Sequence, residues 1–250
     1  MPSANRDKIV EYCNTYLKVA TFTDYCQNGL QVEGSPTVQR AVSGVSFSME
    51  LIRAAIRRKA QMLLVHHGIF GNDLPSPPQI RGVLRDRLKL LLQHDISLCG
   101  YHLPLDAHPL IGNNISLCKL LGVKKATPLC VGFVGDLEAP MQLAKFVDRV
   151  ELKLDTRAQV IAAGPTKIRR VAIISGGSSF RFAEAARAGA QAYVCGDLKE
   201  NVVRAAEETG ITIINAGHYN TEKLGIQNLG KLITRKFRIP IEFVDIPCEV

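Results

Sequence analysis

Two stretches of the chain repeat one pattern of apolar and polar positions. Shifting the sequence by 130 residues lays residues 41–67 over residues 171–197 without a gap, and Gln61 then coincides with Gln191. In each stretch an apolar run is followed by apolar positions spaced for one helix face, and then by a second apolar run. The pattern predicts a duplicated unit whose copies each read strand, helix, strand.

The first copy predicts strands over residues 41–45 and 62–65, joined by a helix over residues 49–59. Ser48 directly precedes this helix. A serine hydroxyl there can accept an N–H bond from the first turn, so we expect Ser48 to be the N-cap.

The second copy predicts a helix over residues 180–188 and a strand over residues 193–195. Residues 175–179, Ser-Gly-Gly-Ser-Ser, precede this helix and could cradle a phosphate with backbone amides. They match no P-loop or dinucleotide motif, so a tight turn with a serine N-cap is favoured. Asp197 is expected to cap a further helix over residues 198–209.

A second pair of similar segments follows the two copies, now offset by 116 residues. Residues 96–102 lie beside residues 212–218, and each segment is an apolar strand that ends in histidine. Four residues after each histidine comes a carboxylate: His102 is followed by Asp106, and His218 is followed by Glu222.

The middle of the chain, residues 127–164, departs from the repeat and reads as an inserted crossover. Its pattern predicts a strand over residues 129–134, a helix over residues 141–150 and a strand over residues 158–162. Residues 74–78, Leu-Pro-Ser-Pro-Pro, are expected to form a stiff loop.

Strands that alternate with helices indicate βαβ units and an α/β fold with mixed, mostly parallel sheets. We expect residues 1–250 to form a single unit built of two pseudo-equivalent repeats, about 41–122 and 171–237. In such sheets, ligands bind beyond the carboxyl ends of the strands. His66 and His67 end one predicted strand. Because the strand ends of the two copies are equivalent, they are expected to face one shared cleft.

Composition is consistent with this picture and excludes a membrane protein. With 46% hydrophobic residues among 250, the chain can bury a full core. The longest apolar runs, such as residues 61–65 and 211–214, are far shorter than the roughly 20 residues of a membrane helix. Residues 1–8 lack a secretory signal pattern, so the protein is expected in the cytoplasm.

Cysteine and charge patterns favour no special chemistry. The seven cysteines are odd in number and include no C-x-x-C pair, which argues against a disulfide framework and a thiolate zinc site. Cys99 and Cys195 lie in apolar runs and are expected in the core. The net charge of +8 would suit a polyanionic partner, but the basic residues are scattered, and a solvated surface explains them equally well.

Imidazole and carboxylate groups are the ligands of borderline and hard divalent ions such as Zn, Mn, Fe, Co or Ni. Three histidines and two carboxylates are too many for one ordinary catalytic zinc, and a carboxylate can bridge two ions. We therefore expect two divalent metal ions per chain. The predicted ligands are His66, His67, Asp106, His218 and Glu222.

His102 has two interpretations. Its pairing with His218 in the repeat would make it a metal ligand, whereas a position behind the ligands would let it orient Asp106 or move protons. His94 and His108 are expected on the surface, at a helix end and in a loop.

Several ordered motifs together resemble the NIF-three-like family of dinuclear metal proteins, which is also known as GTP cyclohydrolase I type 2. The resemblance spans nearly the whole chain. The motifs are Asn28-Gly29-Leu30-Gln31-Val32, His66-His67-Gly68, His102-Leu103-Pro104-Leu105-Asp106 and Gly217-His218-Tyr219-Asn220-Thr221-Glu222.

The resemblance implies two intertwined α/β repeats and a toroidal homohexamer, a trimer of dimers, with its metal sites facing the interior. It also implies the same five metal ligands. Leu103 stands where the family more commonly has threonine, which changes the surroundings of the site but not the ligands.

Two functions remain open. The first is a metal-dependent hydrolase acting on a nucleotide or a related phosphate or ring amide, of which ring opening of GTP is a narrower form that the family suggests. The alternative is a non-enzymatic ring that binds metal and has a regulatory or DNA-associated role, such as resistance to DNA damage. Net charge is compatible with nucleotide or nucleic acid in both cases.

Overall fold

The computed structural model describes residues 2–69 and 79–248. It divides into two compact units: Met1–Leu105 with Ile226–Ile246, and Asp106–Gly225 with Pro247–Val250. Each unit has its own main sheet and its own core. The predicted loop at residues 74–78 lies outside the described residues.

The first unit has a five-stranded sheet in the order β13-β4-β5-β6-β2. Its four strands from β13 to β6 are parallel, and β2 runs antiparallel to β6. The strands are β2 (Gly29–Val32), β4 (Ala41–Ser46), β5 (Met62–His67), β6 (Ser97–Gly100) and β13 (Ile241–Phe243). Strands β1 (Ala4–Asn5) and β3 (Thr37–Val38) form a separate antiparallel pair.

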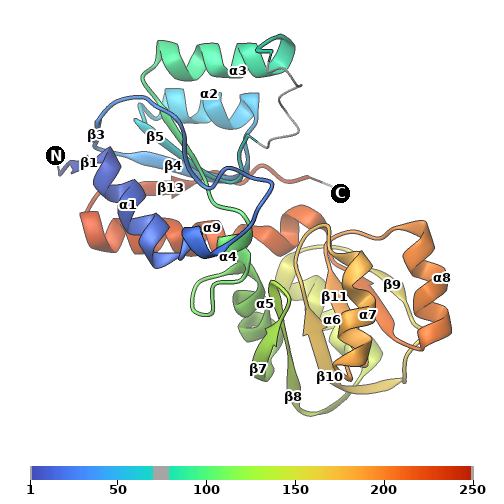
Figure 1. Cartoon of the computed structure of the whole chain (residues 1–250). Coiled ribbons are helices and arrows are strands. Elements are labelled where there is room, and N and C mark those ends of the chain that lie inside the picture. The colour runs from blue at the N-terminus through green and yellow to red at the C-terminus, as the bar shows by residue number, and fades with distance from the viewer. Residues whose placement is uncertain (1, 70–78, 249–250) are drawn as a thin grey trace. The chain divides into compact units, whose positions relative to one another are not determined.

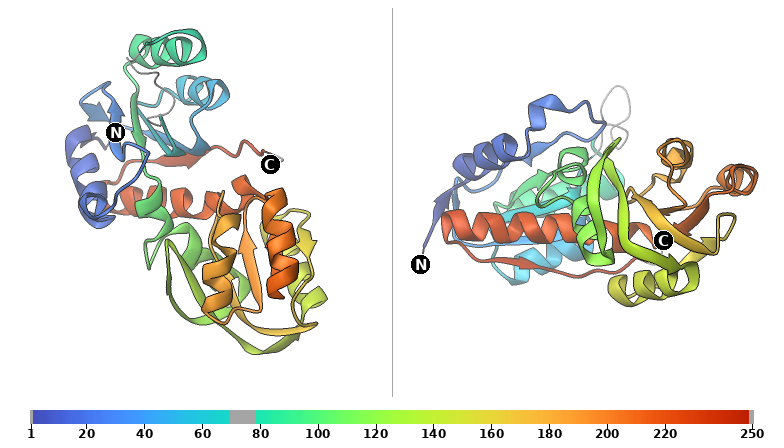
Figure 2. Two further views of the ribbon diagram at one scale, coloured as in Figure 1. Left: turned by 45° about the vertical axis from the view of Figure 1, so that its right-hand side comes forward. Right: turned by 90° about the horizontal axis from the view of Figure 1, so that it is seen from below.

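Helices cover both faces of this sheet. Helices α2 (Met49–Arg57) and α3 (Gly82–Gln93) lie on one face, whereas α1 (Arg6–Tyr16) and the end of α9 (His218–Phe237) lie on the other (Figures 1 and 2). A short 3-10 helix, η1 (Val19–Thr21), follows α1. The rings of Tyr12 and Phe237 meet edge to face at 5.6 Å and so join α1 to α9.

The second unit has a six-stranded sheet in the order β7-β8-β10-β11-β12-β9. Parallel pairing is confined to β10, β11 and β12, which carry the repeat, and the other strands pair antiparallel. The strands are β7 (Val123–Leu129), β8 (Gly132–Gln142), β9 (Gln159–Ile161), β10 (Lys167–Ile173), β11 (Ala192–Cys195) and β12 (Thr212–Asn215). The predicted mixed α/β class is confirmed.

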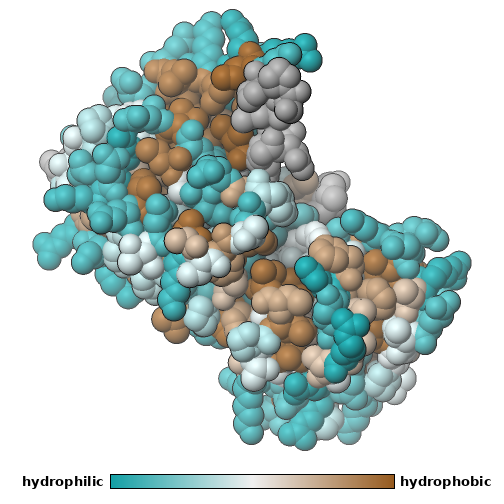
Figure 3. Space-filling view, viewed as in Figure 1, coloured by the Kyte–Doolittle hydropathy of each residue, from teal (hydrophilic) through white to brown (hydrophobic). Residues whose placement is uncertain are grey.

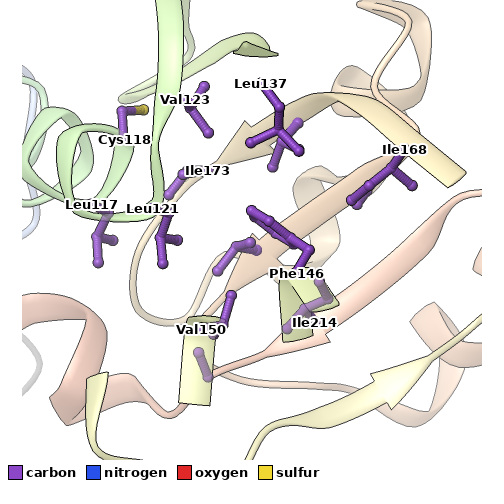
Figure 4. Packing of buried hydrophobic residues seen from close by; sticks show 14 of the residues in the cluster. Leu117, Cys118, Leu121, Val123, Leu137, Phe146, Val150, Ile168, Ile173 and Ile214 are labelled. Carbon is purple, nitrogen blue, oxygen red and sulfur yellow. The ribbon is translucent and has the colours of Figure 1, made fainter. Parts of the chain in front are cut away.

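Successive side chains of this sheet point to opposite faces and pack into two apolar layers. Val171 and Ile173 join α5 (Asn113–Leu121) and α6 (Leu143–Leu154) on one face. Ala172 joins α7 (Phe182–Arg187) and α8 (Glu200–Thr209) on the other face, and the 3-10 helix η3 (Ser179–Arg181) precedes α7. Figure 4 shows Phe146 of α6 among the side chains of the first layer.

One pair of strands in each unit has the same register at the offset of the predicted duplication. Ala41 pairs with Met62 in the first unit, and Val171 pairs with Ala192 in the second, both 130 residues further on. The glutamine that coincides in the two copies also makes the same contacts. Gln61 Oε1 accepts the N–H groups of Gln39 and Arg40 at 3.0 and 3.2 Å, and Gln191 Oε1 accepts those of Arg169 and Arg170 at 2.7 and 3.1 Å.

The second alignment, with its offset of 116 residues, is wrong by one position. Ser97 donates its N–H to Gln61, and Thr212 donates to Gln191, so the structural offset is 115. An apolar run by itself does not fix register, whereas the hydrogen-bond ladder does. His102 therefore corresponds to Gly217 and not to His218.

Of the predicted helix caps and strands, some are present in the structure and others are not. Ser48 caps α2 as expected, since its hydroxyl accepts the N–H of Leu51 at 3.2 Å. The expected strand over residues 129–134 is wrong: the chain turns between β7 and β8 there. Asp197 does not cap α8, because its carboxylate accepts the N–H of Ser179. Ser178 does not cap α7 either, because its hydroxyl donates to the carbonyl of Ile174.

The polarity of the surface and the burial of two of the cysteines are as the sequence predicts. Polar side chains cover most of the face in Figure 3, and apolar ones gather over α2 and α3. Cys99 and Cys195 are fully buried, as expected. Burial also raises the pKa of Cys13 and of Cys118, in each case to about 12. Within the described residues, no helix is long and apolar enough to cross a membrane.

Replacing Phe146 with alanine should lower the free energy of unfolding by about 3–5 kcal/mol, because the ring is fully buried and its removal leaves a cavity. Leu152→Ala on the same helix is the matched control, since Leu152 is 80% exposed; it should cost less than about 0.5 kcal/mol. Denaturant unfolding followed by circular dichroism measures both. Equal losses would show that α6 does not bury Phe146.

Candidate metal centre

Three imidazoles of the first unit lie together at the carboxyl ends of neighbouring parallel strands. His66 and His67 end β5, and His102 follows β6, which pairs with β5 up to Val65 and Gly100. The ring centroids of these histidines are 4.6, 5.1 and 5.7 Å apart. One ring nitrogen from each lies within 4.8 Å of the other two, so the trio could hold a metal ion.

In each of these rings the Nδ1 atom lies within hydrogen-bond distance of an oxygen atom of a residue outside the trio. Metal-binding histidines characteristically use one ring nitrogen for the ion and the other for such a partner, which fixes the ring's tautomer and orientation. The pairs are His66 Nδ1 with the Tyr101 carbonyl at 2.8 Å, His67 Nδ1 with the Ser46 hydroxyl at 3.1 Å, and His102 Nδ1 with an Asp24 oxygen at 2.9 Å.

Asp24 is a residue of this centre that sequence reasoning missed. Besides His102, its carboxylate accepts the N–H groups of Cys26 and Leu103 and an amide N–H of Asn28. Burial by itself raises the pKa of Asp24, but the bonds from His102, Asn28 and Cys26 outweigh it and hold the pKa below its usual range. Asp24 lies in a loop without periodicity, so the sequence carried no signal for it.

In the second unit, His218 and Glu222 form a pair on the first turn of α9. They are four residues apart and so share one helix face, with His218 Nε2 at 3.0 Å from Glu222 Oε2. Glu222 is buried, while the side chain of His218 is 36% exposed. Gly217 precedes the helix at a φ of +85°, a left-handed conformation that favours glycine.

Two glycines leave the space that this pair needs. A Cβ on Gly176, whose φ is +62°, would overlap Glu222 Oε1 and lie 3.1 Å from His218 Nε2. A Cβ on Gly196 would lie 2.7 Å from the hydroxyl of Thr221. The 130-residue repeat places Ser46 and His66 at these positions in the first unit. The two copies therefore present different groups from the same strand ends.

Asp106 ends the short helix α4 (Leu103–Asp106) and is held by neighbours in the second unit. Asn113 donates an amide N–H to Asp106 Oδ1 at 2.8 Å, and the Ser175 hydroxyl donates to the same oxygen at 3.2 Å. Asn114 joins these elements, since it donates to the Asp106 carbonyl and accepts the N–H of Ser175. The carboxylate is thus oriented before any ligand binds.

The turn over residues 175–179 does not present a phosphate cradle. Four of its five N–H groups are donated to protein oxygens, which confirms the turn and leaves too few amides for an anion. The acceptors are Asn114 Oδ1 for Ser175, Thr221 Oγ1 for Gly176, the Gly176 carbonyl for Ser178, and Asp197 Oδ1 for Ser179.

The structure thus places the predicted site residues in groups with ligand chemistry. His66, His67 and His102 cluster in the first unit, while the second unit contains the His218–Glu222 pair and the oriented Asp106. Nitrogen and oxygen donors without thiolates suit borderline and hard divalent ions. As expected, His94 lies exposed at the end of α3 and His108 lies in a loop.

Comparison with known proteins gives matches along almost the whole chain. The sequence profile of the Duf34/NIF3 (NGG1p interacting factor 3) family matches residues 4–248. A "GTP cyclohydrolase 1 type 2 homolog" of Pseudomonas aeruginosa is 43% identical over 245 residues, which cover 96% of each chain.

Solved structures agree. Protein ybgI, of unknown function, has a TM-score of 0.94 at 37% identity and covers 99% of this chain and 100% of its own. TTHA1606 from Thermus thermophilus has a TM-score of 0.92 at 33% identity, with the same coverage. The resemblance seen in the motifs and the predicted fold are both confirmed.

Gly176→Ala should move the Glu222 carboxylate and so lower the amount of divalent metal bound per chain. Gly189→Ala is the matched control, because Gly189 also has a positive φ, +78°, but its nearest atoms to a Cβ are those of Arg170 at 3.7 and 3.8 Å. Both variants should lose about 1–2 kcal/mol of stability from the backbone conformation, and only Gly176→Ala should lose metal. Elemental analysis and denaturant unfolding measure the two effects; full metal content in Gly176→Ala would contradict the expectation.

Proposed function

The chain belongs to the Duf34/NIF3 family, and from this premise we propose that it binds two divalent metal ions and acts as a metal-dependent hydrolase. The proposed substrate is a nucleotide or a related phosphate or ring amide. The proposal depends mainly on one observation: the Nδ1 atom of each clustered imidazole contacts an oxygen atom. Packing alone does not require three histidines to be oriented in this way.

The proposed ligands are those expected from the sequence. They have the chemistry of a dinuclear site, in which a carboxylate bridges and imidazoles complete the coordination. That the five donors serve the same two ions rests on the donor count and on the motifs of the family. The ligands are His66, His67, Asp106, His218 and Glu222.

Bound divalent ions would supply Lewis-acid polarisation of a substrate oxygen and activation of water for attack. The chain's own contribution is to hold the donors in place. Asn113 and Ser175 fix one oxygen of Asp106, and the first turn of α9 holds Glu222 against His218. Donors fixed in this way lose little conformational entropy when an ion binds.

The name of the Pseudomonas aeruginosa relative makes GTP the first substrate to test. We propose ring opening of the guanine base as the narrow form of the activity. Hydrolysis of another nucleotide or of a ring amide is the broader form, and the same ligand set would support either chemistry.

Protein purified without chelators should contain about two divalent ions per chain, and His67→Ala should contain fewer. His94→Ala is the control, since that exposed histidine lies at a helix end. Metal-loaded protein is then offered GTP and other nucleotides, with Asp106→Ala as the comparison. Metal-free protein after incubation with Mn, Fe, Co or Zn would refute the metal site; equal turnover with and without Asp106 would refute the hydrolase.

A cavity in the second unit favours an alternative function, the binding of a polyanion such as nucleic acid. The cavity measures about 680 Å³ and lies beside β8 and α6. Four cations line it together with Glu138, so a phosphate backbone could exchange counterions with it. The cations are Lys124, Lys145, Arg149 and Lys167.

The alternative predicts salt-dependent binding of duplex DNA that survives removal of metal. Lys145→Glu with Lys167→Glu should weaken binding more than Arg53→Glu with Arg57→Glu, a control pair with the same charge change on α2. Each lost phosphate contact should reduce the slope of log affinity against log salt by about 0.9. Fluorescence anisotropy measures this, and no binding at low salt would exclude the alternative.

We propose the homohexamer on the family resemblance alone, and a mass in solution of six times 27.4 kDa would support it. We also propose a cytoplasmic location. All seven cysteines lie in the described part of the chain and none forms a disulfide, as is usual in a reducing compartment.

A further inference from the structure

We propose that the ring of Phe180 is the surface on which the base of a bound nucleotide stacks, and that Lys199 beside it contacts the phosphates. The inference names the parts of the ligand that these side chains recognise. It rests on the proposed function in one respect, because it takes a nucleotide as the ligand. Both residues lie in the second unit and outside the set of proposed metal ligands.

Phe180 is an exposed aromatic residue with two cations beside its ring. It lies in the 3-10 helix η3 and is 51% exposed. The guanidinium carbon of Arg181 lies 4.9 Å from the ring centroid, and Lys199 Nζ lies 5.9 Å from it. An aromatic ring beside cations suits a nucleotide, because the ring stacks on the base and the cations attract phosphate. Single exposed apolar residues are common, so the position of the ring decides whether it marks a binding surface.

The ring lies close to His218 of the candidate metal centre. A Cβ placed on Gly177 would lie 3.5 Å from His218 Cε1 and 3.5 Å from Asp197 Oδ2. Phe180 follows Gly177 by three residues, so its Cα is no more than about 11 Å from that of Gly177. Lys199 follows Asp197 by two residues. A nucleotide held at the donors of this unit therefore has both the ring and the ammonium group within reach.

The backbone on both sides of Phe180 is fixed by hydrogen bonds. Ser179 donates its N–H to Asp197 Oδ1 at 3.2 Å, and Arg181 donates its N–H to the carbonyl of Ser178 at 2.8 Å. An aromatic side chain has only two rotatable bonds, so a ring on a fixed backbone loses little conformational entropy when a ligand stacks on it. The ring is therefore preorganised for stacking.

Of the two cations, Lys199 is the one that an anionic ligand would meet. Arg181 Nη1 lies 2.8 Å from Glu184 Oε1, so much of its charge is already offset. Lys199 is exposed directly before α8, and it forms no ion pair with any other residue of the described ranges 2–69 and 79–248. A lysine ammonium binds phosphate as a point charge. The surface thus offers a ring to the base and a positive charge to the phosphates.

The first test uses the fact that the chain contains no tryptophan. Phe180→Trp adds one fluorophore at the ring position, and GTP added to the full-length protein should quench its emission, because a stacked base quenches an indole. Leu110→Trp is the matched control, since Leu110 is 63% exposed in the same unit; its emission should stay constant. Inorganic tripolyphosphate has the charge without the base and should quench neither variant. Equal quenching by tripolyphosphate and GTP would contradict stacking.

The second test compares affinities by isothermal titration calorimetry. Phe180→Leu keeps an apolar side chain but removes the aromatic face, so it should weaken GTP binding roughly 5–150-fold and leave tripolyphosphate binding unchanged. Phe180→Trp should bind GTP at least as tightly as the wild type. Lys199→Gln should weaken both ligands, because the lost charge contacts phosphate, and Leu110→Ala should weaken neither. Circular dichroism checks that each variant is folded.

The outcomes separate the inference from the proposed function. Wild-type GTP affinity in Phe180→Leu would overturn the stacking role, and turnover in that variant would leave the hydrolase intact. GTP binding that depends on Phe180 in a protein without turnover would support the inference and refute the hydrolase. A wild-type protein that binds no GTP would overturn the inference, while its metal content would still test the metal site.

Two further outcomes would also overturn parts of the inference. Unchanged tripolyphosphate affinity in Lys199→Gln would remove the phosphate contact. A lower mass in solution for Phe180→Leu than for the wild type would place the ring at an interface between copies of the chain, and would remove it as a surface for the base.

Discussion

The register of the parallel strands is the constraint on which the candidate ligand groups of each unit depend. In each unit a glutamine side chain accepts the two backbone N–H groups that directly precede the first residue of the parallel pairing, and so sets the pairing of the next residues. A slip of one residue would turn every side chain to the opposite face. Gln61 and Gln191 thus determine the positions of the strand ends and of the groups that follow them.

At these equivalent strand ends, the two copies present different functional groups. The first unit presents imidazoles directly from β5, whereas the second has Gly196 where the repeat places His66. The space left by glycine is filled from another element, the N-terminal part of α9, which brings Thr221 against Gly196 and Glu222 against Gly176. Duplication therefore conserved the backbone and changed which element supplies the functional groups.

The sequence predicted the features that follow from periodicity. The repeat, its strands and helices, and the clusters of His66 with His67 and of His218 with Glu222 could all be read from spacing. The 116-residue alignment was wrong because apolar residues can be aligned at several offsets. The backbone hydrogen bonds between the strands determine the correct one. Asp24 and Ser175 were missed as partners because a side chain that reaches a distant strand end leaves no local pattern.

One arrangement recurs in both units: the three clustered imidazoles and Asp106 are each held by a group that is not a proposed metal ligand. A carbonyl, a hydroxyl and a carboxylate hold the three imidazoles, and Asn113 with Ser175 holds Asp106. Ring and carboxylate orientations are thus fixed by the fold before an ion arrives, and the entropy of ordering the donors is lost during folding. Metal affinity should therefore depend on residues that never touch the ion. Such residues, Asn113 and Ser175 beside Asp106 among them, are where changes in this chain would tune the site without removing a ligand.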